Sequence, residues 1–188
     1  MYDKALNFSL WCDFLERDFI DKDFDELIKK GIINGATSNP TIFKNAILSS
    51  SAYDAAKEEF RKKEPKKLYE ILATADIRSA AESLLKNFIN GDDGFVSIEV
   101  DPCFADDAEA MYREGKHLYS TIGMPNVMIK IPATKAGYEA MRDLLKKGIS
   151  VNATLVFSPE QTAKCIEAIK EGIAGFRRYF PKANLPKT

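Results

Sequence analysis

Short apolar segments with the two-residue period of a β-strand alternate with longer segments of helical period along the whole chain. The strand-like segments are residues 6–13, 35–38, 95–100, 127–132 and 150–157. The helix-like segments are about 23–30, 51–64 and 66–89, then a helix to about residue 121, and finally 135–147 and 159–173. Repeated strand–helix alternation predicts a parallel sheet with helices packed outside it.

The alternation alone leaves two architectures open, a doubly wound sheet and a (β/α) barrel. In each of the last three strands one face is apolar, and in 150–157 that face extends through Leu155 and Phe157. The opposite faces carry Glu99, Lys130, and Asn152 with Thr154. Helices cannot cover such a polar face without burying its charges, whereas the C-terminal mouth of a barrel is where catalytic side chains collect. We therefore predict an α/β fold of the (β/α)8 TIM barrel family.

The chain supplies only about the first five strand–helix units of such a barrel. A closed barrel needs eight units over about 250 residues. We therefore expect residues 1–188 to form an incomplete barrel domain whose C-terminal strands and helices are missing, with 182–188 leading into the next strand. Open edges at strands one and five would be templates for further pairing. Association with the protein's own C-terminal segment and homo-oligomerisation both stay open.

Composition excludes several classes of function. The formal net charge of −1 and a pI near 6.0 give no reason to expect a nucleic acid or an anionic membrane as partner. No apolar run approaches the roughly 20 residues of a membrane helix, and the N-terminus lacks signal-peptide features, so we expect a cytoplasmic protein. Cys12, Cys103 and Cys165 are widely spaced, which is typical of reduced thiols. With His117 as the only histidine and no glycine-rich phosphate loop, no metal or cofactor is expected.

Lys130 interrupts the apolar run Val127–Pro132. Burial disfavours the charged form of an amine. A neutral amine can attack a carbonyl carbon and form a Schiff base. The alternative is a lysine whose ammonium group reaches solvent or pairs with a carboxylate.

The polar residues expected on the inward face form a chemically coherent set. They are Asp13, Asn39, Glu99, Lys130, Asn152 and Thr154. A lysine nucleophile needs an acid/base for C–C cleavage, for which Asp13 is the candidate, and a held water, for which Glu99 and Thr154 are the candidates. Asn39 and Asn152 could bind substrate hydroxyls. The alternative makes the Asp and Asn residues helix caps, but capping does not explain Glu99 or Lys130, which lie within strands.

Four segments carry a family resemblance. Residues Gly35–Phe43, Val96–Pro102, Val127–Thr134 and Val151–Ser158 resemble the signature blocks of transaldolases, in the same order. The resemblance implies a cofactor-independent barrel enzyme of the pentose phosphate pathway. Such an enzyme transfers a dihydroxyacetone unit from sedoheptulose 7-phosphate to glyceraldehyde 3-phosphate. It also implies roles for six residues: Lys130 as the Schiff-base lysine, Asp13 as the acid/base, Glu99 and Thr154 beside the catalytic water, and Asn39 and Asn152 on the dihydroxyacetone hydroxyls.

The resemblance also implies what is missing. Transaldolases hold the substrate phosphate with a serine and arginines from strands expected after Thr188, and Arg177 and Arg178 on the preceding helix are not substitutes. We therefore expect the 188-residue chain alone to be inactive. Two alternatives stay open: an aldolase that releases dihydroxyacetone from fructose 6-phosphate, and a non-catalytic half-barrel. The aldolase resembles this family but has glutamine at the position of Glu99, so Glu99 favours transfer.

Overall fold

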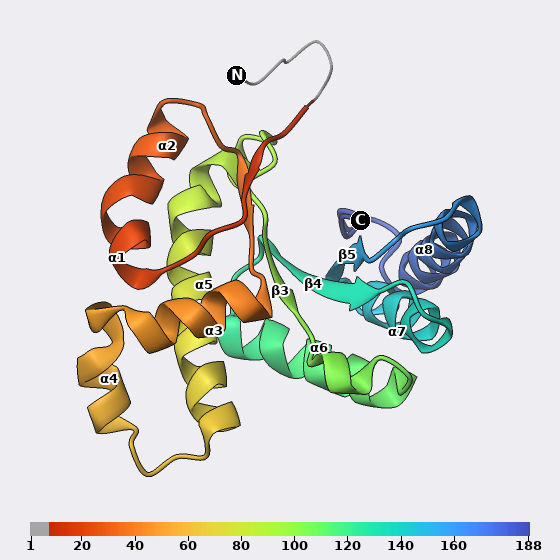
Figure 1. Cartoon of the computed structure of the whole chain (residues 1–188). Coiled ribbons are helices and arrows are strands. Elements are labelled where there is room, and N and C mark those ends of the chain that lie inside the picture. Colours follow the sequence, from red (N-terminus) through yellow and green to blue (C-terminus); the bar gives the residue numbers. More distant parts are fainter. Residues whose placement is uncertain (1–7) are drawn as a thin grey trace. The chain divides into compact units, whose positions relative to one another are not determined.

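The computed structural model describes residues 8–188, in which five parallel strands alternate with helices (Figure 1). The strand order in the sheet is β1-β2-β3-β4-β5. A doubly wound sheet reverses its strand order at a switch point, whereas strands of a (β/α) barrel follow one another around the axis. The unreversed order confirms the α/β class and is that of a partial barrel.

The chain divides into two compact units. The first comprises the residues up to Ser97 together with Ile122–Val127, and the second comprises Ile98–Thr121 together with Met128–Thr188. The chain passes between them within β3 (Val96–Glu99) and at the start of β4 (Val127–Pro132).

The first unit holds β1 (Trp11–Cys12), β2 (Gly35–Thr37) and the start of β3. Its helices are α1 (Arg17–Phe19), a π-helical turn (Ile20–Phe24), α2 (Asp25–Lys29), α3 (Pro40–Ser49), a 3₁₀ turn (Ser51–Tyr53), α4 (Asp54–Glu59) and α5 (Pro65–Ile89). β1 pairs with β2 in the register Trp11↔Gly35, and β2 pairs with β3 in the register Ala36↔Val96. The first predicted strand was too long, because only Trp11 and Cys12 pair; its residues 6 and 7 lie outside the described part.

Helix α3 was not predicted. Directly after the predicted strand at 35–38, Asn39 and Pro40 begin a helix. The Asn39 side chain accepts hydrogen bonds from the backbone N–H groups of Thr41 and Ile42 at 2.9 and 3.2 Å. Pro40 occupies the first helical position, where its missing N–H costs nothing. The helix expected at 23–30 begins earlier, at Arg17, and the one expected at 51–64 is shorter, whereas the prediction of 66–89 is confirmed.

Residues 90–94, which follow α5, hold the starts of β1 and β2. The Asp93 carboxylate accepts hydrogen bonds from the Ser9 hydroxyl and, at 2.6 Å, from Trp11 Nε1. Asp92 accepts one from Asn34 Nδ2 at 3.0 Å. Asp93 adopts a left-handed φ of 59°, which aspartate tolerates better than most residues.

A buried polar network joins the first turn of α1 to α5. Arg17 Nε and Nη2 donate to Asp76 Oδ1 at 3.0 and 2.8 Å, and the Tyr53 hydroxyl donates to Asp76 Oδ2 at 2.8 Å. The Arg17 N–H donates to the Tyr53 oxygen at 3.1 Å. Burial raises the pKa of Asp76, against the lowering effect of the bonds from Tyr53 and Arg17. Nothing in the sequence pattern predicted this network.

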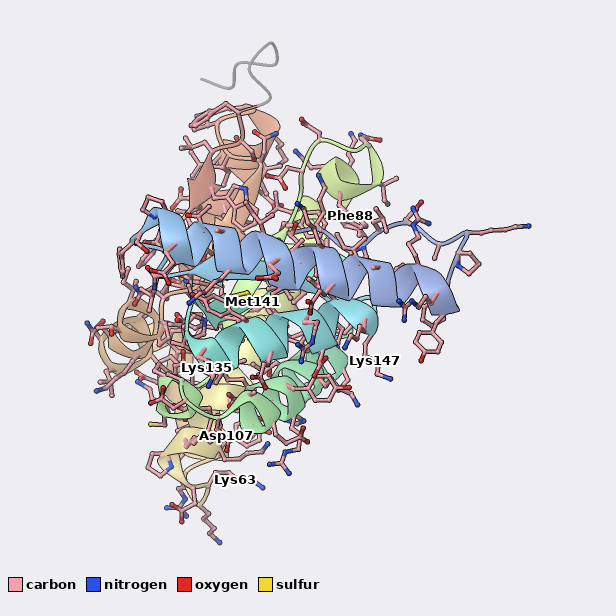
Figure 2. The ribbon with its side chains drawn as sticks, turned by 90° about the vertical axis from the view of Figure 1, so that its right-hand side faces the viewer. Lys63, Phe88, Asp107, Lys135, Met141 and Lys147 are labelled. Carbon is pink, nitrogen blue, oxygen red and sulfur yellow. The ribbon has the colours of Figure 1, made fainter. Side chains whose placement is uncertain are left out.

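The second unit holds the rest of β3 and of β4, together with β5 (Ser150–Thr154). Its other elements are a 3₁₀ turn (Pro102–Phe104), α6 (Ala108–Ile122), α7 (Lys135–Lys146) and α8 (Pro159–Tyr179). Figure 2 shows α7, between the labelled Lys135 and Lys147, running beside α8. Gly172 permits this close approach, because a Cβ there would lie 2.7 Å from Leu145 Cβ.

The predicted apolar faces are confirmed in β3 and β4 and only partly in β5. Ile129 and Ile131 are fully buried. The last strand, however, ends at Thr154 rather than at residue 157. Leu155 has a left-handed φ of 58°, which breaks the strand, and Leu155 and Phe157 are 53% and 82% exposed. The strand prediction was therefore wrong for these residues, because apolar alternation continued past the point where the backbone turns.

No helix formed by residues 8–188 combines the length and the apolar character that a membrane crossing requires.

Candidate active site

Strands β4 and β5 place three of the predicted site residues together in the second unit. Their parallel register sets Lys130 opposite Asn152 and Pro132 opposite Thr154. Residues paired across adjacent strands point to the same face, and so do residues two apart on one strand. Lys130, Asn152 and Thr154 therefore share one face at the C-terminal ends of their strands.

Glu99 completes this group from β3. Its Oε2 lies 3.6 Å from Lys130 Nζ, and the two side chains are 15% and 12% exposed. The Val100 N–H donates to the Lys130 carbonyl at 3.3 Å, which ties the ends of these two strands together. The nitrogen–oxygen distance allows an ion pair but exceeds that of a good hydrogen bond. A half-buried amine beside a carboxylate is the arrangement that nucleophilic chemistry with proton shuttling requires.

Asp13 and Asn39 lie in the first unit, beyond the ends of β1 and β2. Asp13 is exposed in the connection that leads to α1. Asn39 is half-buried, and its carboxamide oxygen caps α3, as the capping alternative predicted. Cys12 precedes Asp13 on β1, and burial raises the pKa of its thiol, with Asp13 adding to the effect. A thiol held in its neutral form is a poor nucleophile.

Other candidate groups have structural surroundings. His117 is exposed on α6. Arg177 Nη1 donates to the carbonyls of Pro181 and Ala183 at 3.0 and 2.9 Å, so this arginine holds the segment after α8. Among residues 8–188 no three His, Cys, Asp or Glu side chains are grouped to hold a metal ion.

Sequence reasoning missed Gln161. Its side chain lies between the segments that follow β4 and β5, donating to the Ala133 carbonyl and accepting from the Phe157 N–H. Ser158-Pro159-Glu160-Gln161 has the spacing of a capping box, which marks Gln161 as a residue of a helix start but does not predict a bond to another loop.

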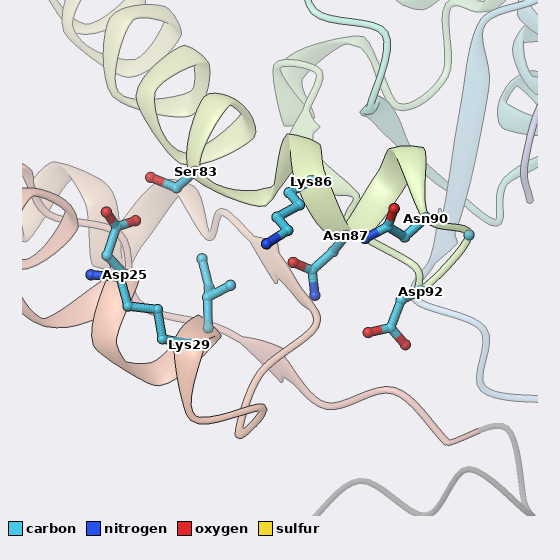
Figure 3. Close-up of a pocket in the computed structure, with 9 residues that line it drawn as sticks. Asp25, Lys29, Ser83, Lys86, Asn87, Asn90 and Asp92 are labelled. Carbon is cyan, nitrogen blue, oxygen red and sulfur yellow. The ribbon is translucent and has the colours of Figure 1, made fainter.

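A separate groove of about 810 Å³ lies in the first unit (Figure 3). Asp25 and Lys29 of α2 face Lys86 and Asn87 of α5 across it, beside Asp92. None of the predicted site residues lines this groove. Its balanced charges select no class of ligand, so we assign it no chemistry.

Comparison with known proteins gives consistent matches. Residues 10–179 match the family model described as Transaldolase/Fructose-6-phosphate aldolase. A transaldolase of Campylobacter jejuni (strain RM1221) is 54% identical over 172 residues, which are 92% of this chain and 53% of that protein. A transaldolase of Helicobacter pylori (strain Shi470) is 45% identical over 163 residues, 86% of this chain and 52% of that protein. The chain thus spans about half the length of the curated relatives it matches.

Proposed function

Since this chain belongs to the transaldolase/fructose-6-phosphate aldolase family, we propose that it carries the Schiff-base centre of a transaldolase. The reaction would transfer a dihydroxyacetone unit from a ketose phosphate, sedoheptulose 7-phosphate, to an aldose phosphate, glyceraldehyde 3-phosphate. The observation that supports this most directly is the half-buried pair of Lys130 and Glu99 at 3.6 Å, beside Asn152 on the next strand.

The first step is iminium formation. The neutral Lys130 amine attacks the ketose carbonyl carbon, and the carbonyl oxygen leaves as water after it has gained two protons. Glu99 and the Thr154 hydroxyl would hold this water and transfer the protons. Their places on strands adjacent to Lys130 suit that role. The same groups would return the water when the iminium is hydrolysed.

The second step is C–C cleavage. Asp13 would accept the proton of the hydroxyl next to the bond that breaks, and the iminium would take up the electron pair as an enamine. The aldose phosphate leaves, the enamine attacks the acceptor aldehyde, and Asp13 returns its proton to the new hydroxyl. The iminium supplies the electron sink, so this mechanism requires no cofactor.

Asn39 and Asn152 would orient the dihydroxyacetone hydroxyls. Because the Asn39 oxygen accepts the N–H groups of Thr41 and Ile42, the Asn39 amide nitrogen is the group that would donate to substrate. Asn152 lies opposite Lys130 in the register and would act beside the iminium.

Borohydride trapping tests the proposal. The chain is incubated with fructose 6-phosphate, reduced and mapped by peptide mass, alone and joined to the remaining C-terminal portion of the Campylobacter jejuni transaldolase. We expect a reduced adduct on the Lys130 peptide of the joined protein, and no turnover by the 188-residue chain alone. Absence of an adduct in both forms would refute the proposal.

An aldolase activity is the second candidate, because the matching family model covers fructose-6-phosphate aldolases as well. The two activities differ in the fate of the enamine, which an aldolase protonates and releases as dihydroxyacetone. We expect little free dihydroxyacetone in the absence of an acceptor aldehyde. Its steady accumulation at the rate of donor consumption would favour the aldolase.

We further propose that the protein works in the cytoplasm and associates with the C-terminal strands and helices of a complete barrel. The three thiols are free cysteines, which suits a reducing compartment. Lys187 accepts a hydrogen bond from the Val151 N–H at 3.0 Å, so the segment after α8 already pairs with β5. Native mass measurement of the protein purified from its own cells would distinguish this association from a homo-oligomer.

A further inference from the structure

We infer that Gln161 is a positioning residue for the Schiff-base centre: its carboxamide links the segments after β4 and β5 and thereby holds Thr154 in place relative to Lys130. The inference rests on the proposed function, in which Thr154 acts on the water of iminium formation.

The carboxamide of Gln161 is bound at both ends. Nε2 donates to the Ala133 carbonyl at 3.0 Å, and Oε1 accepts the Phe157 N–H at 2.8 Å. A carbonyl requires a donor and an N–H requires an acceptor, so the two partners fix which end of the amide faces which segment.

These bonds close a ring around the ends of the two strands. Ala133 follows Lys130 by three residues, and its N–H donates to the Thr154 carbonyl at 2.9 Å. Phe157 follows Thr154 by three residues. The ring therefore runs from Thr154 to Ala133, through the Gln161 side chain, and back along the chain from Phe157.

The segment within this ring has little other support. Leu155 is 53% exposed and Phe157 is 82% exposed, so apolar packing contributes little to their placement. Leu155 is also in the left-handed region, which leucine rarely adopts without surrounding constraints. The bond from Phe157 to Gln161 is thus a principal restraint on the backbone immediately after Thr154.

Helix capping does not account for this geometry. In a capping box the third helical residue would bind the N–H of Ser158, whereas Gln161 binds Phe157 and a carbonyl of another loop. The start of α8 is capped independently, because the Ser158 hydroxyl accepts the Gln161 N–H at 3.1 Å.

Two substitutions test the inference. They are made in the 188-residue chain or in the joined protein, whichever forms the Lys130 adduct with its unchanged sequence. Gln161→Met keeps the side-chain length and removes both bonds. We expect the rate constant of adduct formation with fructose 6-phosphate to fall about tenfold, since two neutral hydrogen bonds are lost. Thr162→Val, which removes a neighbouring bond within α8 from Thr162 to the Ser158 carbonyl, should retain the wild-type rate.

Gln161→Glu adds a pH readout that general loss of structure would not produce. Its carboxylate can accept from Phe157 but cannot donate to Ala133 until it is protonated. With cyanoborohydride as the trapping agent, the ratio of the variant's rate to the wild type's should rise as the pH falls from 7.5 toward about 5. A ratio independent of pH, or a wild-type rate for Gln161→Met, would overturn the inference.

Amide hydrogen exchange separates this inference from the proposed function. In Gln161→Met the N–H groups of Ala133 and Phe157 should exchange at least several-fold faster, whether or not the protein turns over. Failure of the wild type to form an adduct would refute the proposed function. Unchanged exchange at Ala133 would refute the link between the two segments, whatever the trapping result.

Discussion

The two units each contain a cation–carboxylate pair withdrawn from water, and the pairs differ in geometry. In the first unit Arg17 Nη2 lies 2.8 Å from Asp76 Oδ1, with side chains 29% and 4% exposed. In the second unit Lys130 Nζ lies 3.6 Å from Glu99 Oε2, with side chains 12% and 15% exposed. The arginine uses two nitrogens and its carboxylate also binds Tyr53, whereas the lysine and its carboxylate do not reach hydrogen-bond distance.

The difference is the one we expect between a stabilising pair and the pair that we propose to be reactive. A buried carboxylate that accepts three short bonds loses much when one partner is removed. A nucleophilic lysine must present its amine nitrogen to a carbonyl carbon, and a short hydrogen bond to a carboxylate would occupy that nitrogen. We therefore expect substitutions in the network to change mainly stability and substitutions at the site to change mainly chemistry.

Lys130→Met gives the largest expected effect. Removal of the amine should abolish the adduct. It should also lower turnover by the joined protein by on the order of 10³-fold or more. The free energy of unfolding, measured with urea, should change by only about 1 kcal/mol, because methionine keeps the apolar stem buried. Lys135→Met, at an exposed lysine that begins α7, is the control and should keep the adduct. An adduct that persists on another lysine in Lys130→Met would contradict the assignment.

Asp76→Ala should lower stability strongly and change the chemistry at Lys130 little. Its loss leaves the Arg17 guanidinium and the buried Tyr53 hydroxyl without their acceptor, so we expect the free energy of unfolding to fall by about 2–3 kcal/mol. Asp18→Asn removes an exposed pair with Lys22 and should cost less than about 0.5 kcal/mol. Equal losses in the two variants would show that the buried network contributes no more than a surface pair.

The network should also make stability fall in alkaline solution. Burial, and next the charge of Asp76, raise the pKa of Tyr53 above its usual value near 10. Above pH 10 the unfolded chain loses the phenol proton while the folded chain keeps it, so the folded state binds more protons and its stability decreases as the pH rises. The contribution is up to about 1.4 kcal/mol per pH unit. In Tyr53→Phe the free energy of unfolding should not show this decrease above pH 10. If it depends on pH above 10 in the same way in the variant and the wild type, the prediction is wrong.

The sequence predicted the proximity of Lys130 and Glu99 better than the network. Lys130 and Glu99 interrupt apolar strands whose period is two, so their face follows from the local pattern and their proximity from the adjacency of β3 and β4 in the sheet. Arg17, Tyr53 and Asp76 come from three helical segments with ordinary polar spacing, and only tertiary packing brings them together. The regular two-residue period of the strands, rather than chemical type, made the Lys130–Glu99 pair foreseeable, because the helical segments carry no comparable pattern.

Local backbone geometry was a second limit. The pattern of residues 150–157 is that of one strand, yet Leu155 turns the chain after Thr154. Asn39-Pro40 was interpreted as a strand end although the same residues form a good helix start. In both places the pattern of side chains did not reveal the backbone direction, which depends on the left-handed φ of Leu155 and on the cap that Asn39 forms.

Leu155→Gly gives the smallest expected effect and measures strain beside the reactive pair. Glycine removes the cost of the left-handed conformation, roughly 1–2 kcal/mol for an L-residue, while its freedom in the unfolded chain costs about 0.5–1 kcal/mol. Leu155 is more than half exposed, so little burial is lost, and we expect the free energy of unfolding to rise by about 0.5 kcal/mol. Val156→Gly is the matched control, because it adds the same freedom at a residue whose φ is not positive, and it should be destabilising by about 0.5–1 kcal/mol. If urea unfolding gives equal losses for both variants, the backbone at Leu155 stores no strain, and the Gln161 bonds are then the restraint on the backbone after Thr154.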